Sequence, residues 1–141
     1  MQIIGKITQE EKNLLLKDLC ARLPYDVKVN CNDKVYNFNG IQYFNICILT
    51  DDNENNAFTT AGIKYIKPYL FPLSSMTEEQ KTFFDDKHID IDDILGIVAI
   101  FAHVNCEEWI EIIDWLNKNH FDYRGLIPKG SAIDATGLNI Y

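Results

Sequence analysis

The chain has 141 residues, 47% of them hydrophobic and 24% charged, which suffices for one globular domain and excludes a disordered polypeptide. The 13 Lys and Arg residues are outnumbered by 21 Asp and Glu residues, so the net charge is −8, a poor match for the phosphates of nucleic acids. The N-terminal string MQIIGKITQEEKN lacks the apolar core of a signal peptide, and no apolar stretch reaches the roughly 18 residues of a membrane span. We therefore expect a cytoplasmic protein with no membrane segment.

The first predicted element is a helix over residues 8–22. Thr8 suits the N-cap position because its side-chain oxygen can accept a backbone N–H, and acidic residues follow in the first turn. Leucines then recur at helical spacing until Pro24, which stops the helix. We predict an amphipathic helix that begins at Thr8 and ends at Arg22.

Residues 25–73 have a pattern that is typical of short β-strands. Apolar and polar residues alternate over residues 27–31, which predicts a half-buried strand. The pairs Asn32-Asp33 and Asn39-Gly40 both tolerate positive φ, so each is predicted to form a tight hairpin turn.

Three further segments complete the predicted sheet. Residues 41–50 are rich in β-branched and aromatic side chains and predict a strand, and residues 58–60 predict a shorter one. Because proline cannot donate to a ladder, residues 63–73, with Pro68 and Pro72, are predicted to form a turn and at best an edge strand. Five short strands joined by hairpins form either a small antiparallel sheet or an SH3-like barrel.

The following residues are predicted to be helical up to Asn119. Thr77 and Gln80 have the spacing of a capping box, which starts a helix over residues 77–86. A second helix, capped by Asp92 or Asp93, runs to residue 104. A third covers residues 105–119 and has an apolar face at helical spacing that consists of Trp109, Ile112, Ile113 and Leu116.

The C-terminal segment, residues 120–141, contains Gly and Pro at turn spacing and predicts turns with one short helix at most. Phe121 and Leu126 are too apolar for a free tail, so we expect the segment to dock with both side chains buried. Arg124 is then expected to pair with Asp114 or Asp122. The elements together predict one α+β domain over residues 1–141, with an N-terminal helix, a small antiparallel sheet and a C-terminal helical portion.

The sequence shows no recognisable catalytic or metal-binding motif. Its four cysteines form no C-x-x-C pair, so we interpret them as reduced thiols and predict no metal and no cofactor. The acidic residues between Asp85 and Asp93 are dense enough to attract a hard cation, but Ile91 and Ile97 stand where a calcium loop needs Gly and Glu. We interpret this stretch as a solvated linker between two helices.

The best candidate for a binding site is the string HFDYRG, which follows the last predicted helix. Its polar side chains can converge where the helix ends, and they are His120, Asp122, Tyr123 and Arg124. We predict a recognition surface for a partner peptide, or for an anion at Arg124, in which His120 and Arg124 are the exposed members. The alternative is a folded-back tail in which His120 stabilises the helix C-terminus and Arg124 pairs with a carboxylate.

Three blocks of sequence carry a resemblance to a known family: KDLCARLPYDVKV (residues 17–29), IKPYLFPLSSMTEEQ (residues 66–80) and IDWLNKNHFDYRGLIPKGSAIDA (residues 113–135). They resemble small uncharacterised proteins that recur in the genomes of gut anaerobes and in their phages and mobile elements. The blocks cover a little over a third of the chain. The resemblance implies an accessory or phage-associated role, and it transfers no activity, cofactor or catalytic residue.

Three functions are therefore open. The absence of catalytic motifs, the acidic charge and the 15 Tyr and Phe residues favour a non-enzymatic interaction or accessory protein that binds another protein. An SH3-like barrel would also suit a nucleic-acid accessory protein, which the net charge disfavours. A small enzyme with its site between His120 and Arg124 would need a pocket there. The sequence specifies neither the partner nor the oligomeric state.

Overall fold

The computed structural model of the chain describes residues 7–52, 55, 57–85 and 106–141. The predicted helix that ends at residue 104 lies outside the described residues, and so do His88, His103 and all of the acidic stretch except Asp85. The Cys106 side chain is not described either.

The first described element is α1 (Gln9–Arg22), as the sequence predicts. The Thr8 side chain caps the helix by accepting a hydrogen bond from the Glu11 backbone N–H at 3.1 Å. Leu15 and Leu19 are buried on one side of α1. The short 3-10 helix η1 (Leu23–Tyr25) follows, because Pro24 cannot continue the α-helical hydrogen bonding.

Strands β1 (Lys28–Cys31) and β2 (Lys34–Gln42) form the first predicted hairpin. Asn32 and Asp33 connect them with φ values of 53° and 62°, which confirms the tight turn. Two successive residues at positive φ twist the turn in the same sense as the strands it joins.

The second predicted hairpin turn, Asn39-Gly40, is wrong, because both residues lie inside β2. The register with the next strand shifts between Phe38 and Gly40, and Gly40 has a φ of 142°. The Asn-Gly pair thus forms a bulge in a strand that continues, since glycine accepts this backbone conformation. The chain reverses three residues later in the 3-10 helix η2 (Tyr43–Asn45), so the predicted strand over residues 41–50 is divided between two strands.

Strand β3 (Ile46–Asp51) pairs with β2 on one side and with β4 (Ala57–Gly62) on the other. The β3–β4 ladder is antiparallel and unbroken from Ile46 opposite Gly62 to Asp51 opposite Ala57. Strand β4 therefore extends the short strand that the sequence predicts at residues 58–60 in both directions.

The predicted edge strand is in fact central. After the 3-10 helix η4 (Ile63–Tyr65), strand β5 (Lys67–Pro72) lies between β1 and β6 (Phe121–Asp122) and also pairs with β7 (Ile133–Asp134). Its prolines are tolerated because the β1 ladder is only two residue pairs long and Pro72 ends the strand. Its pairing with β6 and β7 is parallel, and both partners come from the C-terminal segment.

The α+β class is confirmed, with an N-terminal helix, a sheet and a C-terminal helix. The strand order is β4-β3-β2-β1-β5-β6, with β7 beside β5. The sheet formed by the described strands is open and mixed, with antiparallel pairing from β4 to β5 and parallel pairing beyond. This order gives no support to an SH3-like barrel.

The predicted capping box is confirmed. Gln80 donates its backbone N–H to the Thr77 hydroxyl at 3.1 Å, and its side-chain oxygen accepts the Thr77 backbone N–H at 2.8 Å. The helix it starts is shorter than predicted, because α2 (Glu78–Lys81) passes into the 3-10 helix η6 (Thr82–Phe84). The last helix, α4 (Cys106–Lys118), has the predicted apolar face, with Ile112 and Leu116 buried and Trp109 and Ile113 partly buried.

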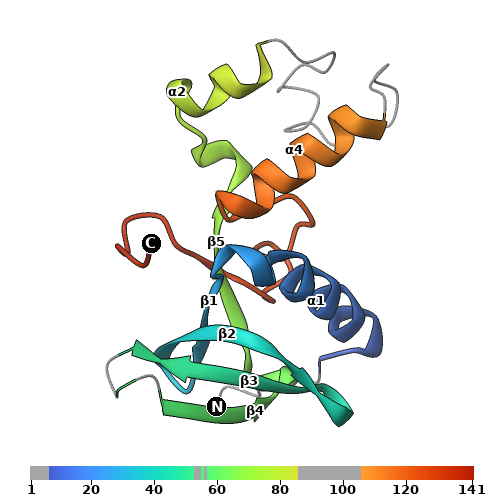
Figure 1. Cartoon of the computed structure of the whole chain (residues 1–141), viewed down its shortest axis with the longest axis vertical. Helices are drawn as coiled ribbons and strands as arrows, with labels where there is room; N and C mark the ends of the chain where they lie inside the picture. Colours follow the sequence, from blue (N-terminus) through green and yellow to red (C-terminus); the bar gives the residue numbers. More distant parts are fainter. Residues whose placement is uncertain (1–6, 53–54, 56, 86–105) are drawn as a thin grey trace.

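Two hydrophobic clusters hold these elements together. The sheet cluster joins α1 to the inner face of the sheet through Leu15, Leu19, Val27, Val29, Cys31, Phe38, Cys47, Leu49, Ile63, Ile66, Leu70, Leu126 and Ala132. The helix cluster joins α4 to the segment around α2 through Met76, Phe84, Ile112, Leu116 and Phe121. Figure 1 shows β2, β3 and β4 at one end of the molecule, α2 and α4 at the other, and α1 between them.

The C-terminal segment docks as predicted, with Phe121 and Leu126 at 1% and 0% exposure. Within residues 120–141 the structure places the predicted turns, and it adds two short strands that the sequence did not predict. Phe121 packs in the helix cluster and Leu126 in the sheet cluster, so the segment joins the two. In the described part of the chain, no helix has the length and apolar character that a membrane span requires.

The burial of Leu116 leads to a stability prediction. Leu116→Ala should lower the free energy of unfolding by about 2–5 kcal/mol, because a fully buried leucine leaves a cavity when it is truncated. Ile110 lies on the same helix but is 61% exposed, so Ile110→Ala should cost less than about 1 kcal/mol. Urea denaturation of both variants measures the difference, and equal losses would contradict the assigned helix face.

Candidate functional site

The predicted site begins at His120, two residues after the end of α4. The His120 backbone has a φ of 61°, and its N–H donates to the Asn117 carbonyl at 3.1 Å, which closes the helix. Its own carbonyl accepts the Phe71 N–H at 2.8 Å, which starts the pairing of β6 with β5. The backbone of His120 thus connects the end of α4 to the sheet.

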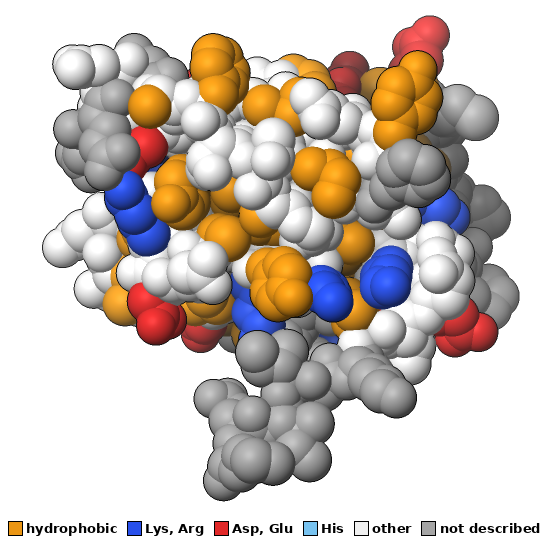
Figure 2. All heavy atoms as spheres, turned by 90° about the horizontal axis from the view of Figure 1, so that it is seen from below, with side chains coloured by type: hydrophobic (Ala, Val, Ile, Leu, Met, Phe, Trp, Pro, Cys, Tyr) orange, Lys and Arg blue, Asp and Glu red, His pale blue; other side chains and the backbone are white. Residues whose placement is uncertain are grey.

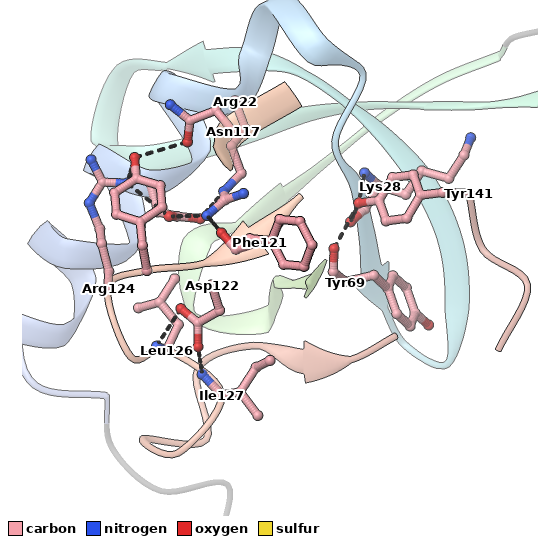
Figure 3. A network of polar contacts seen from close by, with 12 residues as sticks. Arg22, Lys28, Tyr69, Asn117, Phe121, Asp122, Arg124, Leu126, Ile127 and Tyr141 are labelled. Atoms are coloured by element: carbon pink, nitrogen blue, oxygen red, sulfur yellow. Dashed lines mark hydrogen bonds and ion pairs between the residues drawn. The ribbon is translucent and has the colours of Figure 1, made fainter. Parts of the chain in front are cut away.

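A buried ion pair on α1 lies close to His120. Arg22 donates from Nε to Asp18 Oδ2 at 2.9 Å and from Nη2 to Asp18 Oδ1 at 3.1 Å, and both side chains are fully buried. Arg22 Nη2 also donates to the carbonyl oxygen of Phe121 at 2.6 Å. Figure 3 shows the Arg22 guanidinium directed from α1 at the β6 backbone. The ion pair therefore ties the first helix to a strand 99 residues away in sequence.

Arg124 also pairs with Asp18, which is neither of the two acids that the sequence suggests. Its Nη1 donates to Asp18 Oδ1 at 2.9 Å and to the Tyr123 hydroxyl at 2.7 Å, and its guanidinium lies 4.6 Å from the centre of the Tyr123 ring. The Tyr123 hydroxyl in turn donates to Asn117 Oδ1 at 2.9 Å. One carboxylate thus receives two guanidinium groups.

Asp122 is not the partner of Arg124 because its carboxylate has another role. Its two oxygens accept the backbone N–H groups of Leu126 and Ile127, each at 2.9 Å (Figure 3). These bonds close the turn that carries Leu126 into the sheet cluster. Asp114, the other acid that the sequence suggests, is exposed on α4.

His120 is buried, which corrects the expectation that it is an exposed binding residue. Its side chain is 9% exposed, and its ring stacks on Tyr141 with centroids 3.7 Å apart and planes within 10°. Burial and the nearby Arg22 charge lower the pKa of His120 to about 4, so the ring is neutral at pH 7. Its Nδ1 has no hydrogen-bond partner among the described residues.

Tyr141 connects the network to strands β1 and β5. Its hydroxyl accepts the Lys28 backbone N–H at 3.0 Å and donates to the Tyr69 carbonyl at 2.7 Å, between β1 and β5 (Figure 3). Enclosure of the hydroxyl raises the pKa of Tyr141. The network therefore extends from α1, through the end of α4, to the last residue of the sequence.

Sequence reasoning missed four members of this network: Asp18, Arg22, Asn117 and Tyr141. A signal for two of them is present. Asp18 and Arg22 are four residues apart and lie on the same helical stripe as the buried Leu15 and Leu19. An acid and a base on a buried stripe at that spacing predict a buried ion pair.

The arrangement holds separate elements of the fold together. The polar groups of Asp18, Asp122, Tyr123 and Arg124 bind each other or backbone groups. Among the described residues, no group of three or more His, Cys, Asp or Glu side chains is placed to hold a metal ion. A binding role of His120, Asp122, Tyr123 and Arg124 stays a prediction, and only Tyr123 and Arg124 keep a partly exposed side chain.

Cys20, Cys31 and Cys47 are free thiols, as predicted; Cys20 is exposed, whereas Cys31 and Cys47 are buried. Burial, with smaller contributions from the Cys20 and Cys31 thiols, raises the pKa of Cys47 to about 12. Because the thiolate is the nucleophilic form of cysteine, Cys47 is a structural side chain in the sheet cluster.

The second candidate surface is the outer sheet face, which we define as the side of β1–β4 opposite the sheet cluster. Alternation places these residues on it: Lys28, Asn30, Val35, Asn37, Asn39, Ile46, Ile48, Thr50, Phe58 and Thr60. All of them are exposed or partly exposed, and Phe58 is 74% exposed. Figure 2 views the molecule from the end that carries β2–β4 and shows apolar side chains in the middle of the view, with Lys or Arg side chains beside some of them and most acidic side chains toward the edge.

Polar side chains organise one part of the outer sheet face. Lys28 Nζ donates to Asn37 Oδ1 at 2.7 Å, and Asn37 Nδ2 donates to Asp52 Oδ1 at 2.6 Å. These bonds hold long side chains in place beside the apolar ones, so a partner would meet an ordered surface.

Comparisons of the chain with protein-family models, with curated proteins and with solved structures found no match.

Removal of the shared carboxylate should destabilise the fold. Asp18→Asn leaves two guanidinium groups without their counter-charge, one of them fully buried, and the expected loss in the free energy of unfolding is about 3–5 kcal/mol. Asp26→Asn is the matched control, because Asp26 is exposed and its φ of 56° suits asparagine; it should change stability by less than about 0.5 kcal/mol. Chemical denaturation at neutral pH compares the two variants.

His120 should make the protein less stable in acid. Its folded-state pKa of about 4 lies below the ordinary histidine pKa of 6.5, so the unfolded chain binds the proton more tightly. The contribution of His120 is complete above pH 6.5 and is lost as the pH falls toward 4, by about 3 kcal/mol. His120→Asn keeps a residue that accepts positive φ and removes the titration. The stability difference between wild type and variant should shrink over this pH range, and a constant difference would refute the assignment.

Proposed function

We propose that the chain is a non-enzymatic interaction protein that binds another protein through the outer sheet face. The observation that carries this proposal is an accessible sheet face on which large apolar side chains, among them Phe58, stand beside ordered polar ones. Surfaces of this mixed character are typical of protein–protein contacts, in which apolar area supplies affinity and polar groups fix orientation.

The charge distribution supports a protein partner over a nucleic acid. Residues 27–75, which include the first five strands, carry four basic and four acidic residues: Lys28, Lys34, Lys64 and Lys67 against Asp33, Asp51, Asp52 and Glu54. A phosphate backbone needs a surplus of basic groups, and this part of the chain has none. The alternative of a nucleic-acid accessory protein, which rested on an SH3-like barrel, has lost its structural support.

The alternative of a small enzyme at His120 to Arg124 is also less well supported. His120 is buried, its ring is covered by Tyr141, and the neighbouring polar groups hold α1, α4 and the C-terminal segment together. A general acid or base must reach a substrate proton, which this placement of the imidazole does not favour.

The resemblance to small proteins of gut anaerobes and their phages supports an accessory role, and we propose an origin in a phage or mobile element. A cytoplasmic location stays a prediction. Free thiols at Cys20, Cys31 and Cys47 are in keeping with a reducing compartment.

Site-specific photocrosslinking tests the interaction. A photoreactive phenylalanine analogue is placed at Asn39, an exposed position of the outer sheet face, or at Ile110, an exposed position on α4. After irradiation of the host cells, mass spectrometry should identify an adduct between position 39 and another protein, and no such adduct from position 110. Equal labelling from both positions, or none from position 39, would argue against this face.

A further inference from the structure

Strand β4 forms one end of the sheet. It pairs with β3 over its whole length, whereas its other edge pairs with no strand among the described residues. The strand is six residues long, and Ala57, Phe58, Thr59 and Thr60 are exposed. Every second backbone N–H and C=O of such a strand points away from the sheet and is ready to bind another extended chain.

This edge lacks the features by which edge strands are usually protected. The strand reads AFTTAG, without a lysine, another charge or a proline, and its ladder with β3 has no bulge. Soluble proteins normally place such features on a free edge, because an unprotected edge recruits further strands. An edge of this kind is therefore suited to strand addition.

We infer that β4 pairs in antiparallel fashion with β4 of a second copy of this chain. A two-fold axis perpendicular to the sheet keeps both outer sheet faces on the same side and puts each residue opposite a residue of the same face. Such an axis through Thr60, next to the strand centre, sets Thr60 opposite Thr60 of the second copy. Phe58 then lies opposite Gly62, which has no side chain and has the Tyr65 ring of its own copy beside it.

The charge distribution favours this way of self-association. Each copy has a net charge of −8, so two copies must meet where charge is low. Strand β4 is uncharged, whereas α2 and α4 carry the exposed acids Glu78, Glu79, Glu107, Glu111 and Asp114. Figure 1 shows these helices at the opposite end of the molecule from β4, so pairing through β4 keeps the acidic ends of the two copies apart.

The pairing does not depend on the partner proposed above. It joins two outer sheet faces into one continuous surface, so that any partner of that face would meet two copies of its site. A single strand pair buries less than the about 1,200 Å² of a standard interface, so the dimer should be weak and concentration-dependent.

Sedimentation velocity of the purified full chain, from low micromolar to near-millimolar concentration, tests the dimer. The wild type should shift from monomer to dimer. Thr60→Lys places two like charges face to face and should raise the dissociation constant at least about tenfold. Gln42→Lys adds the same charge at an exposed position on β2, away from the edge, and should dimerise like the wild type. Circular dichroism and thermal unfolding verify that each variant is folded.

A charge-swap experiment tests the register. Thr60→Lys and Thr60→Glu should each be monomeric alone, and an equimolar mixture should form a heterodimer, because residue 60 of one copy faces residue 60 of the other. A wild type that stays monomeric at every concentration overturns the inference. A dimer that withstands Thr60→Lys, or a mixture that remains monomeric, overturns it as well. Photocrosslinking to another protein from position 39 is measured independently, so the two proposals can fail separately.

Discussion

The carboxylate of Asp18 is the point on which the rest of the structure depends. It is fully buried and accepts hydrogen bonds from Arg22 on its own helix and from Arg124 in the C-terminal segment. A buried carboxylate between two guanidinium groups is stable only when all three are held in place, because each charge loses its hydration. Helix α1 and the segment after α4 are therefore held in one fixed relation.

The fixed position of the C-terminal segment against α1 allows this segment to contact both hydrophobic clusters. Phe121 enters the helix cluster and Leu126 the sheet cluster, and the Asp122 carboxylate shapes the turn between them. Strand β5 also connects the two clusters, because Leu70 belongs to the sheet cluster and Phe71 packs against the helix cluster. The string HFDYRG thus connects the sheet cluster to the helix cluster. The accessible surfaces with features of a contact site are the outer sheet face and the β4 edge.

Local signals predicted the fold well where the decisive partners are close in sequence. The Thr8 cap, the Asn32-Asp33 turn and the Thr77 capping box each satisfy backbone groups within a few residues, and each is present. The same reasoning failed at Asn39-Gly40, because a pair that tolerates positive φ can form a bulge as readily as a turn. It also failed at β5, where the prolines indicated an edge and the missing information was a strand from the C-terminal segment.

The sequence by itself determined the α+β class, the helix starts at Thr8 and Thr77, the apolar face of α4 and the docking of residues 120–141. Spacing and composition decide local structure and which residues must be buried. Only the tertiary structure decided that Arg124 pairs with Asp18, that His120 is buried under Tyr141, and that β5 is central while β4 is an edge. These facts depend on contacts between residues tens of positions apart. Charge and periodicity identify groups that need a partner, and the packing of remote elements selects which partner each one meets.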